Sequence, residues 1–216
     1  MSFFARDAIL NTMKPSIATT EPTASVFVYL APLPDGEPTA PVFPPARWQS
    51  ICECKSERVR REKYHVWKLL EYAVRDRYGK ELKDLQFSCA NGKWTCDLCH
   101  ISLTHSHGVL GVAVSDFPVG IDVEKITEPT DALVRKLFTE DELQRYHGMP
   151  KSEKPEFFTR LWTRKESLFK QAGGAGFFTT EASGYTQESV HSFHGENYVL
   201  SVATDPAFDV HIIHIA

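Results

Sequence analysis

The chain has 216 residues, 42% of them hydrophobic and 12% aromatic, which is enough for one sizeable domain or two small packed lobes and argues against disorder. Its formal net charge of −4 does not suit a whole surface that binds nucleic acid, and no apolar run approaches the roughly 20 residues that cross a bilayer. Residues 47–84 carry 11 Lys and Arg against 7 Asp and Glu, which fits a phosphate, an acidic partner or simply a solvated helix face.

The amino terminus and the cysteines indicate the cellular compartment. The opening residues MSFFARDAILNTMKPS carry charges where a signal peptide would be apolar, so we expect no export signal. Five cysteines, an odd number, then favour reduced thiols over a disulfide framework. We therefore expect a cytoplasmic protein with no membrane partner.

The first regular element is a strand at residues 25–31, rich in β-branched and aromatic side chains, after a poorly defined segment at 1–24. Six prolines between residues 32 and 45 predict an irregular connector. Apolar residues at helical spacing then predict a helix from residue 57 that stops at Gly79.

Short strands and two further helices fill the rest of the chain. The expected elements are a hairpin turning at Asn91-Gly92, strands at 108–115 and 119–126, helices at 131–146 and 154–172, and β-rich runs within 177–216. Helix and strand in both halves predict an α+β fold of two similar lobes. We place the amino-terminal lobe at residues 25–117 and the carboxy-terminal lobe at 118–216.

The segment CDLCH, Cys96 to His100, is a candidate metal site. Its pattern occurs in c-type haem attachment, which normally follows export, and in one half of many zinc sites. A zinc-stabilised binding module using Cys89, Cys96, Cys99 and His100 is one alternative, although no second close pair of ligands is present. We favour the interpretation that these cysteines are small buried side chains on a strand.

The segment GIDVEKI places two carboxylates on one face of a strand. Asp122 and Glu124 point the same way, whereas Ile121 and Val123 point into the core. Two neighbouring carboxylates repel each other unless a positive group separates them, and Mg²⁺ prefers oxygen ligands. The segment therefore predicts either a magnesium site or a solvated acidic edge strand.

The segment LWTRKESLFKQAGG places polar residues among aromatic ones. On a helix, Trp162, Lys165, Glu166 and Phe169 share one stripe, with Lys170 one turn beyond Glu166. The stripe could be an aromatic core with a Glu166–Lys170 surface pair. It could also supply a third carboxylate for a cation and two ammonium groups for phosphate oxygens.

These segments resemble the signature of the 4′-phosphopantetheinyl transferases of the single-chain, two-lobed type. The family pattern is (I/V)-G-(I/V)-D, then F-(S/T)-x-x-E, then W-x-x-K-E-(S/A)-x-x-K. In this chain the three motifs are VGID at residues 119–122, FTEDE at 138–142 and WTRKESLFK at 162–170. The resemblance implies two similar α/β lobes packed as a pseudo-dimer in one chain, and a monomer.

The resemblance also implies an activity. It is the transfer of 4′-phosphopantetheine from coenzyme A to a serine of an acyl or peptidyl carrier protein, with Mg²⁺, or Mn²⁺, as cofactor. Asp122, Glu124 and Glu166 would bind the metal and, through it, the pyrophosphate. Glu166, or a water molecule on the metal, would take the proton of the serine, so that Asp122, Glu166 and Lys170 form the catalytic set.

Further residues acquire roles through the same resemblance. Lys165 and Lys170 would hold phosphate oxygens, and Glu142 would order water at the metal. The family's Ser-His-Ser element reads Thr104-His105-Ser106, which assigns a coenzyme A phosphate to His105. The remaining residues implied in coenzyme A binding are Thr104, Lys93, Lys68 and Lys55. A relative that binds coenzyme A without transferring anything is a second alternative.

Overall fold

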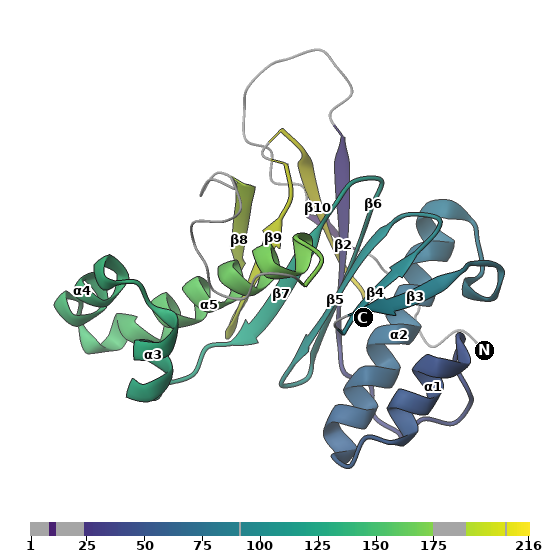
Figure 1. Cartoon of the computed structure of the whole chain (residues 1–216), viewed down its shortest axis with the longest axis horizontal. Coiled ribbons are helices and arrows are strands. Elements are labelled where there is room, and N and C mark those ends of the chain that lie inside the picture. The colour runs from purple at the N-terminus through teal and green to yellow at the C-terminus, as the bar shows by residue number, and fades with distance from the viewer. Residues whose placement is uncertain (1–8, 12–23, 91, 175–188, 206) are drawn as a thin grey trace.

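The structure is a computed structural model that describes residues 9–11, 24–90, 92–174, 189–205 and 207–216 (Figure 1). Most of the predicted segment 1–24, Asn91 of the predicted turn and residues 177–188 of the predicted β-rich end lie outside the described residues.

The strands of the described residues form three sheets. The largest has the order β1-β10-β2-β6-β5, with β1 Ile9–Asn11, β10 Asp209–His214, β2 Ser25–Pro32, β6 Val109–Ser115 and β5 His100–Ser106. Its pairs are antiparallel except for β10, which runs parallel to β2. The second sheet has the order β7-β9-β8, with β7 Gly120–Lys125, β9 Tyr198–Ala203 and β8 Val190–His194. The third is the predicted hairpin of β3 Phe87–Ala90 and β4 Lys93–Cys96.

The helices are α1 Pro45–Cys52, α2 Glu57–Tyr78, α3 Asp131–Leu137, α4 Glu140–Gly148 and α5 Lys154–Gln171. Two short 3₁₀ helices, Leu82–Asp84 and Lys151–Glu153, precede β3 and α5. The prediction of α2 is confirmed: its first turn is capped by Ser56, and Gly79 ends it in the left-handed conformation with φ 63°.

Two helix expectations need correction. The proline-rich connector leads into α1, a helix that was not predicted. Pro45 is compatible with this helix because it stands in the first turn, where its missing N–H costs nothing. The single helix predicted at 131–146 is wrong, since α3 and α4 are separate. Thr139 lies between them and forms a capping box with Glu142, which starts a new helix.

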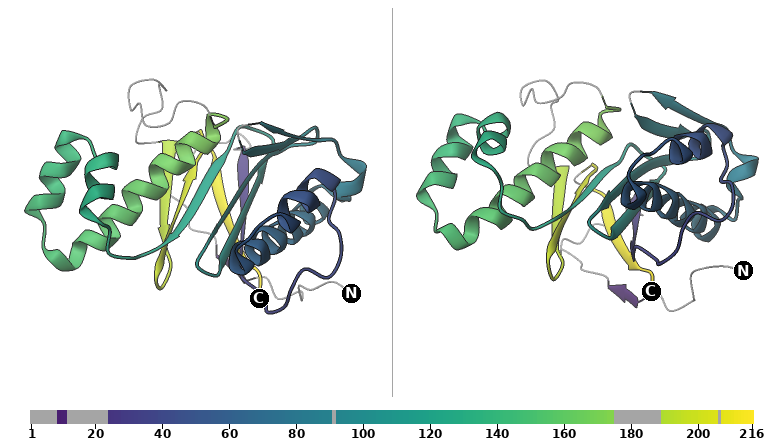
Figure 2. Two further views of the ribbon diagram at one scale, coloured as in Figure 1. Left: turned by 60° about the horizontal axis from the view of Figure 1, so that its bottom comes forward. Right: turned by 90° about the horizontal axis from the view of Figure 1, so that it is seen from below.

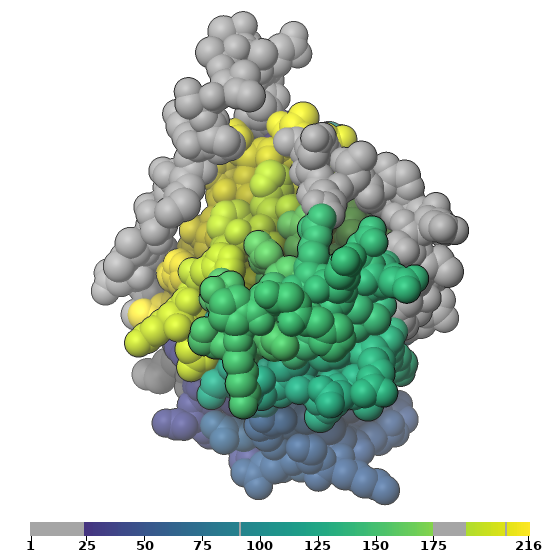
Figure 3. All heavy atoms as spheres, turned by 90° about the vertical axis from the view of Figure 1, so that its left-hand side faces the viewer, coloured from purple at the N-terminus to yellow at the C-terminus, as the bar shows by residue number. Residues whose placement is uncertain are grey.

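The sheets and helices form layers that share apolar cores. Helix α2 covers the outer face of the five-stranded sheet, and α5 lies along the three-stranded sheet (Figures 1 and 2). The inner faces of the two sheets pack together through an apolar cluster that includes Val28, Ala113, Ile121 and Leu200. Helices α3 and α4 form the teal and green face nearest the viewer in Figure 3 and pack on α5 through a small cluster of their own.

The architecture confirms the α+β class. The predicted boundary between residues 117 and 118 falls between β6 and β7, while β10, near the carboxyl end, joins the first sheet beside β2. Among the described residues, the helices are all too short or too polar to cross a membrane.

Gly120, the first residue of β7, allows α5 to approach the second sheet closely. A Cβ at this position would lie 1.9 Å from the carbonyl oxygen of Ser167 and 2.5 Å from the backbone nitrogen of Gln171. Both atoms belong to the backbone of α5, so no side-chain rotation could relieve the overlap. The glycine therefore fixes the distance between β7 and the last turns of α5.

We expect Gly120→Ala to lower the free energy of unfolding by at least about 1–3 kcal/mol, the usual range for overpacking. Gly148→Ala is the matched control, because a Cβ at Gly148 meets no atom of the described residues within 4 Å. Urea denaturation of both variants tests the expectation, and equal stabilities would contradict the close-approach argument.

Candidate functional site

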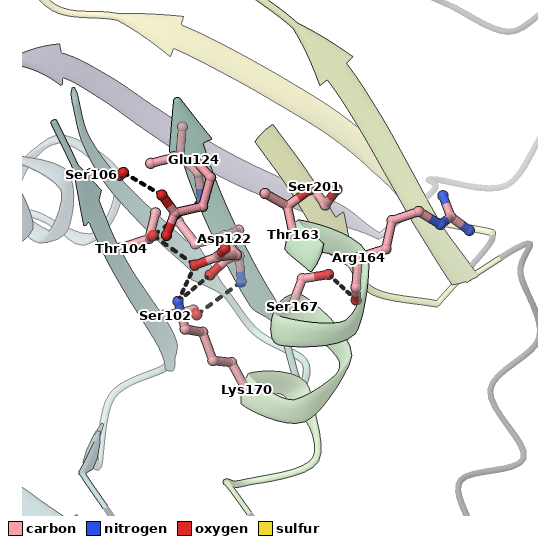
Figure 4. A network of polar contacts seen from close by, with 12 residues as sticks. Ser102, Thr104, Ser106, Asp122, Glu124, Thr163, Arg164, Ser167, Lys170 and Ser201 are labelled. Carbon is pink, nitrogen blue, oxygen red and sulfur yellow. Dashed lines mark hydrogen bonds and ion pairs between the residues drawn. The ribbon is translucent and has the colours of Figure 1, made fainter. Parts of the chain in front are cut away.

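The candidate site lies where β5 and β7 run side by side at the edges of their sheets. Among the described residues, no backbone ladder joins these two strands. Hydroxyl groups join them instead: Ser102 accepts a hydrogen bond from the backbone N–H of Ile121 at 3.0 Å, and Thr104 accepts one from Val123 at 3.1 Å. Alternate residues of β5 thus face β7, as the strand period of two requires (Figure 4).

Hydroxyls of β5 also hold the two carboxylates of β7. Thr104 donates to Oδ1 of Asp122 at 3.0 Å, and Ser106 donates to Oε2 of Glu124. Asp122 is only 5% exposed. Its Oδ1 also accepts from Nζ of Lys170 at 2.6 Å, whereas its buried Oδ2 has no hydrogen-bond partner among the described residues. One oxygen of the Asp122 carboxylate therefore has hydrogen-bond partners, and the other is available to a ligand.

Helix α5 contributes the other charged groups beside Asp122. The ammonium of Lys170 donates to the carbonyl oxygen of Ile121 at 3.0 Å as well as to Asp122, and it reaches β7 from the last turn of α5 (Figure 4). Glu166, one turn earlier, is half-buried. Burial raises its pKa, and the charge of Asp122 raises it further while Lys170 opposes the shift.

Glu124 has a similar environment. Burial raises its pKa, the hydrogen bond from Ser106 lowers it, and the charge of Asp122 raises it again. Raised values at Glu124 and Glu166 mean that both carboxylates are destabilised in their ionised form. A cation bound among them would reverse that cost. A metal site formed by Asp122, Glu124 and Glu166 remains a prediction, and the charge of Asp122 acts on both glutamates.

Basic groups from β4 and β5 come close to the same end of α5. Lys93, on β4, donates through Nζ to the backbone carbonyl of Lys170. Burial lowers the pKa of Lys93, and the nearby charge of Lys170 lowers it further. The pKa of His105, at the end of β5, is lowered mainly by burial, with Lys170 among the smaller causes. Three basic side chains therefore gather beside the carboxylates.

Glu62 is a buried partner of His105 that the sequence analysis did not identify. Its Oε2 lies 3.2 Å from Nδ1 of His105, and its side chain is only 3% exposed. A signal was present, because Glu62 stands between Val59 and Val66 on the apolar stripe of α2, where a carboxylate is costly unless it has a partner. Ser102 and Ser106 were also detectable, as they alternate with Thr104 along one strand.

Arg47, on α1, is a second buried charge that the sequence analysis missed. It is 7% exposed, donates to the carbonyl oxygen of Lys63 at 2.8 Å and lies over the ring of Trp67. Burial lowers its pKa to about 10. Its charge also lowers the pKa of His105, so it belongs to the electrostatic surroundings of the site.

Other predicted site residues lie elsewhere or have other partners. Lys165 donates to the carbonyl oxygen of Leu137 and to Oε2 of Glu142, both at 2.6 Å, so Glu142 joins α5 to the start of α4. Lys68 forms an ion pair with Glu71 on α2, and Lys55 is exposed just before that helix. The hydroxyl of Thr104 is occupied by Asp122 and Val123. The coenzyme A contacts of these residues stay predictions.

The cysteines do not form the alternative zinc site. Cys96 and Cys99 are close together, but Cys89 is exposed on β3 and His100 is exposed at the start of β5. The interpretation of these thiols as buried strand residues is wrong in two places. Cys89 is on a strand but exposed, and Cys99 is buried but lies in a turn.

Within the described residues, no group of three His, Cys, Asp or Glu side chains has the geometry of a metal site. The donor set around Asp122 nonetheless suits a hard cation chemically. Its Oδ2 is a buried acceptor without a partner, and Glu124 and Glu166 have raised pKa values that a cation would lower. These carboxylates would supply oxygen ligands for such an ion.

Comparison with known proteins identifies relatives of this site. Residues 118–211 match the model of the 4′-phosphopantetheinyl transferase superfamily, a range that contains β7 and α5. The 4′-phosphopantetheinyl transferase ffp of Bacillus subtilis is 31% identical over 110 residues, 49% of each chain. The 4′-phosphopantetheinyl transferase psf-1 of Bacillus pumilus is 28% identical over 153 residues, 66% of each chain. The chain therefore spans about half to two thirds of the length of these relatives.

We expect Thr104→Val to lower the free energy of unfolding by about 1–3 kcal/mol, because it leaves buried polar groups at Asp122 and Val123 without their partner. Thr104→Ser keeps the hydroxyl and should recover most of the loss. Urea denaturation distinguishes the two, and a Thr104→Val variant as stable as the wild type would contradict the role assigned to the hydroxyl.

We expect Glu166→Gln to stabilise the metal-free protein at pH 7. The folded state raises the pKa of Glu166, so wild-type stability falls as pH rises above the ordinary glutamate value of about 4.3. Glu166→Gln has no carboxyl to ionise, so it does not lose stability in this way. Its stability advantage over the wild type should disappear near pH 4, where Glu166 is largely protonated in both the folded and the unfolded state. Thermal unfolding at both pH values measures this, with the exposed Glu128→Gln as control. An advantage of equal size at both would contradict it.

Proposed function

We propose that this chain, whose residues 118–211 match the model of the 4′-phosphopantetheinyl transferase superfamily, is an enzyme that transfers 4′-phosphopantetheine from coenzyme A to a serine hydroxyl of an acyl or peptidyl carrier protein. The observation that supports this most directly is the gathering of Lys93, His105 and Lys170 beside Asp122, Glu124 and Glu166. Phosphoryl-group transfer needs cations for phosphate oxygens and a carboxylate near the attacking hydroxyl.

Asp122, Glu124 and Glu166 would hold Mg²⁺, or Mn²⁺. Oδ2 of Asp122, which is buried and has no hydrogen-bond partner in the part of the chain that the structure describes, would be one of the ligands. The ion would neutralise charge on the pyrophosphate of coenzyme A. Lys170 is already fixed by Asp122 and the carbonyl oxygen of Ile121, so its ammonium would meet a phosphate oxygen with little loss of side-chain entropy.

Glu166 would act as the base that accepts the proton of the acceptor serine. Its half-buried carboxylate lies one helical turn from Lys170, and a carboxylate within hydrogen-bond reach of the attacking hydroxyl can accept its proton. His105 would contact a phosphate of coenzyme A while Glu62 holds the opposite edge of its ring through Nδ1. Lys93 would lie near the nucleotide, on the side of the site that β4 provides.

We also propose that the two sheets with α2 and α5 are similar lobes of a pseudo-dimer, and that the chain works as a cytoplasmic monomer. Each sheet has one long helix on its outer face, which supports that arrangement. The exposed basic residues Lys55 and Arg58 near the start of α2 suit an acidic carrier protein, and we expect no nucleic acid or membrane partner.

The test is the intact mass of an apo acyl carrier protein after incubation with this protein, coenzyme A and Mg²⁺. We expect a gain of one phosphopantetheine group that EDTA prevents. Asp122→Ala and Glu166→Ala should each slow the reaction by about 10²-fold or more, the usual contribution of a positioned acid or base. The exposed Glu128→Ala should react like the wild type.

Coenzyme A binding, measured by calorimetry, separates the remaining outcomes. Binding without transfer to any of several carriers would support the alternative of an inactive relative. Neither binding nor transfer would overturn the proposal, and stoichiometric zinc in protein purified without chelator would return attention to the cysteines.

A further inference from the structure

The turn between β4 and β5 brings two thiols together. The Sγ atom of Cys96 lies 3.9 Å from Sγ of Cys99 and donates to the carbonyl oxygen of Cys99 at 3.2 Å. The five cysteines, all within the described residues, are free. Because a disulfide needs a sulfur separation of about 2.05 Å, side-chain rotations across roughly 2 Å would bring the two atoms into bonding range.

The two thiols have unequal environments. Cys96 is half-buried at the end of β4, whereas Cys99 is 9% exposed and packs with the core beneath α2. A hydrogen bond from Cys99 lowers the pKa of Cys96 to about 6, and the same interaction together with burial raises the pKa of Cys99. An accessible thiolate next to a protected thiol is the arrangement found in Cys-x-x-Cys redox sites.

We propose that Cys96 and Cys99 form a thiol–disulfide exchange site, with Cys96 as the attacking thiol and Cys99 as the resolving thiol. Its oxidant is a low-molecular-weight disulfide of the glutathione type. The Cys96 thiolate attacks one sulfur of that disulfide, which forms a mixed disulfide and releases one glutathione thiolate. Cys99 then loses its proton and attacks Sγ of Cys96, which releases the second glutathione. Two protein thiols are oxidised to one disulfide, and one glutathione disulfide is reduced to two thiols.

The position of the pair gives oxidation a structural consequence. Cys96 is the last residue of β4, the strand that carries Lys93, and Lys93 reaches the carbonyl oxygen of Lys170. The turn is already fixed at Asp97, whose Oδ1 accepts from the backbone N–H of Gln86 at 3.0 Å. A disulfide here would tie the base of the hairpin to the start of β5. Any effect on coenzyme A rests on the proposed function, whereas the exchange chemistry does not.

The experiment uses the full chain, reduced, treated with EDTA and desalted, then incubated with glutathione disulfide in the absence of oxygen. Alkylation, digestion and mass spectrometry locate each modification. We expect a peptide in which Cys96 and Cys99 together have lost two hydrogen atoms, and recovery of both thiols after dithiothreitol. At pH 7, Cys96 should react several-fold faster than the exposed Cys89, because its pKa of about 6 makes most of Cys96 thiolate and Cys99 is at hand to resolve the mixed disulfide.

Variants separate the two roles. Cys99→Ser should trap glutathione on Cys96 as a stable adduct, while Cys89→Ser should leave formation of the Cys96–Cys99 disulfide unchanged. Cys96→Ser, as a second variant, should leave Cys99 unmodified because it is buried. A stable adduct on Cys96 in the wild type, no reaction at Cys96, or glutathione on Cys99 in Cys96→Ser would each overturn the proposal.

Discussion

The hydroxyl contacts between β5 and β7 are the constraint on which the rest of the structure depends. A hydroxyl can accept one hydrogen bond and donate another, and Thr104 does both, accepting from the backbone of Val123 and donating to the carboxylate of Asp122. Ser102 and Ser106 divide the same two tasks between them. The bonds that hold the two sheets together are therefore the bonds that position the carboxylates, so the site cannot shift relative to the joint.

Charge distribution around this joint explains why the site suits an anionic ligand with a cation. Burial and the charge of Asp122 raise the cost of ionising Glu124 and Glu166, and Lys170 offsets only part of that cost. Lys93 donates to the backbone carbonyl of Lys170, and burial and the charge of Lys170 lower its pKa. Without a ligand, the site therefore holds carboxylates near one another and lysines near one another at an electrostatic cost. A cation bound to the carboxylates and an anion bound to the lysines would each lower that cost.

Much of the fold and the core of the site could be predicted from local patterns. The spacing of apolar residues predicted α2, and the alternation in GIDVEKI predicted that Asp122 and Glu124 share a face. The failures have two causes. The break between α3 and α4 is marked by a local pattern that the sequence analysis overlooked, because Thr139 followed three residues later by Glu142 is the pattern of a capping box. The second cause is contacts distant in sequence. The ion pair of Lys165 with Glu142 and the contact of Glu62 with His105 join separate elements, so no local period identifies these partners, although the apolar stripe of α2 marks Glu62 itself.

Strand β10 has a consequence for how the protein is made. It lies between β1 and β2, with Asp209 opposite Ser25, and the backbone N–H of Ile215 donates to the carbonyl oxygen of Leu30. During synthesis, the edge of β2 that pairs with β10 therefore stays unpaired until nearly all of this sequence has left the ribosome. Such an edge is a template for pairing with other chains. A nascent chain that stalls before β10 would present the apolar strand Val26–Leu30 to chaperones or to aggregation, even though the residues of the candidate site were already synthesised.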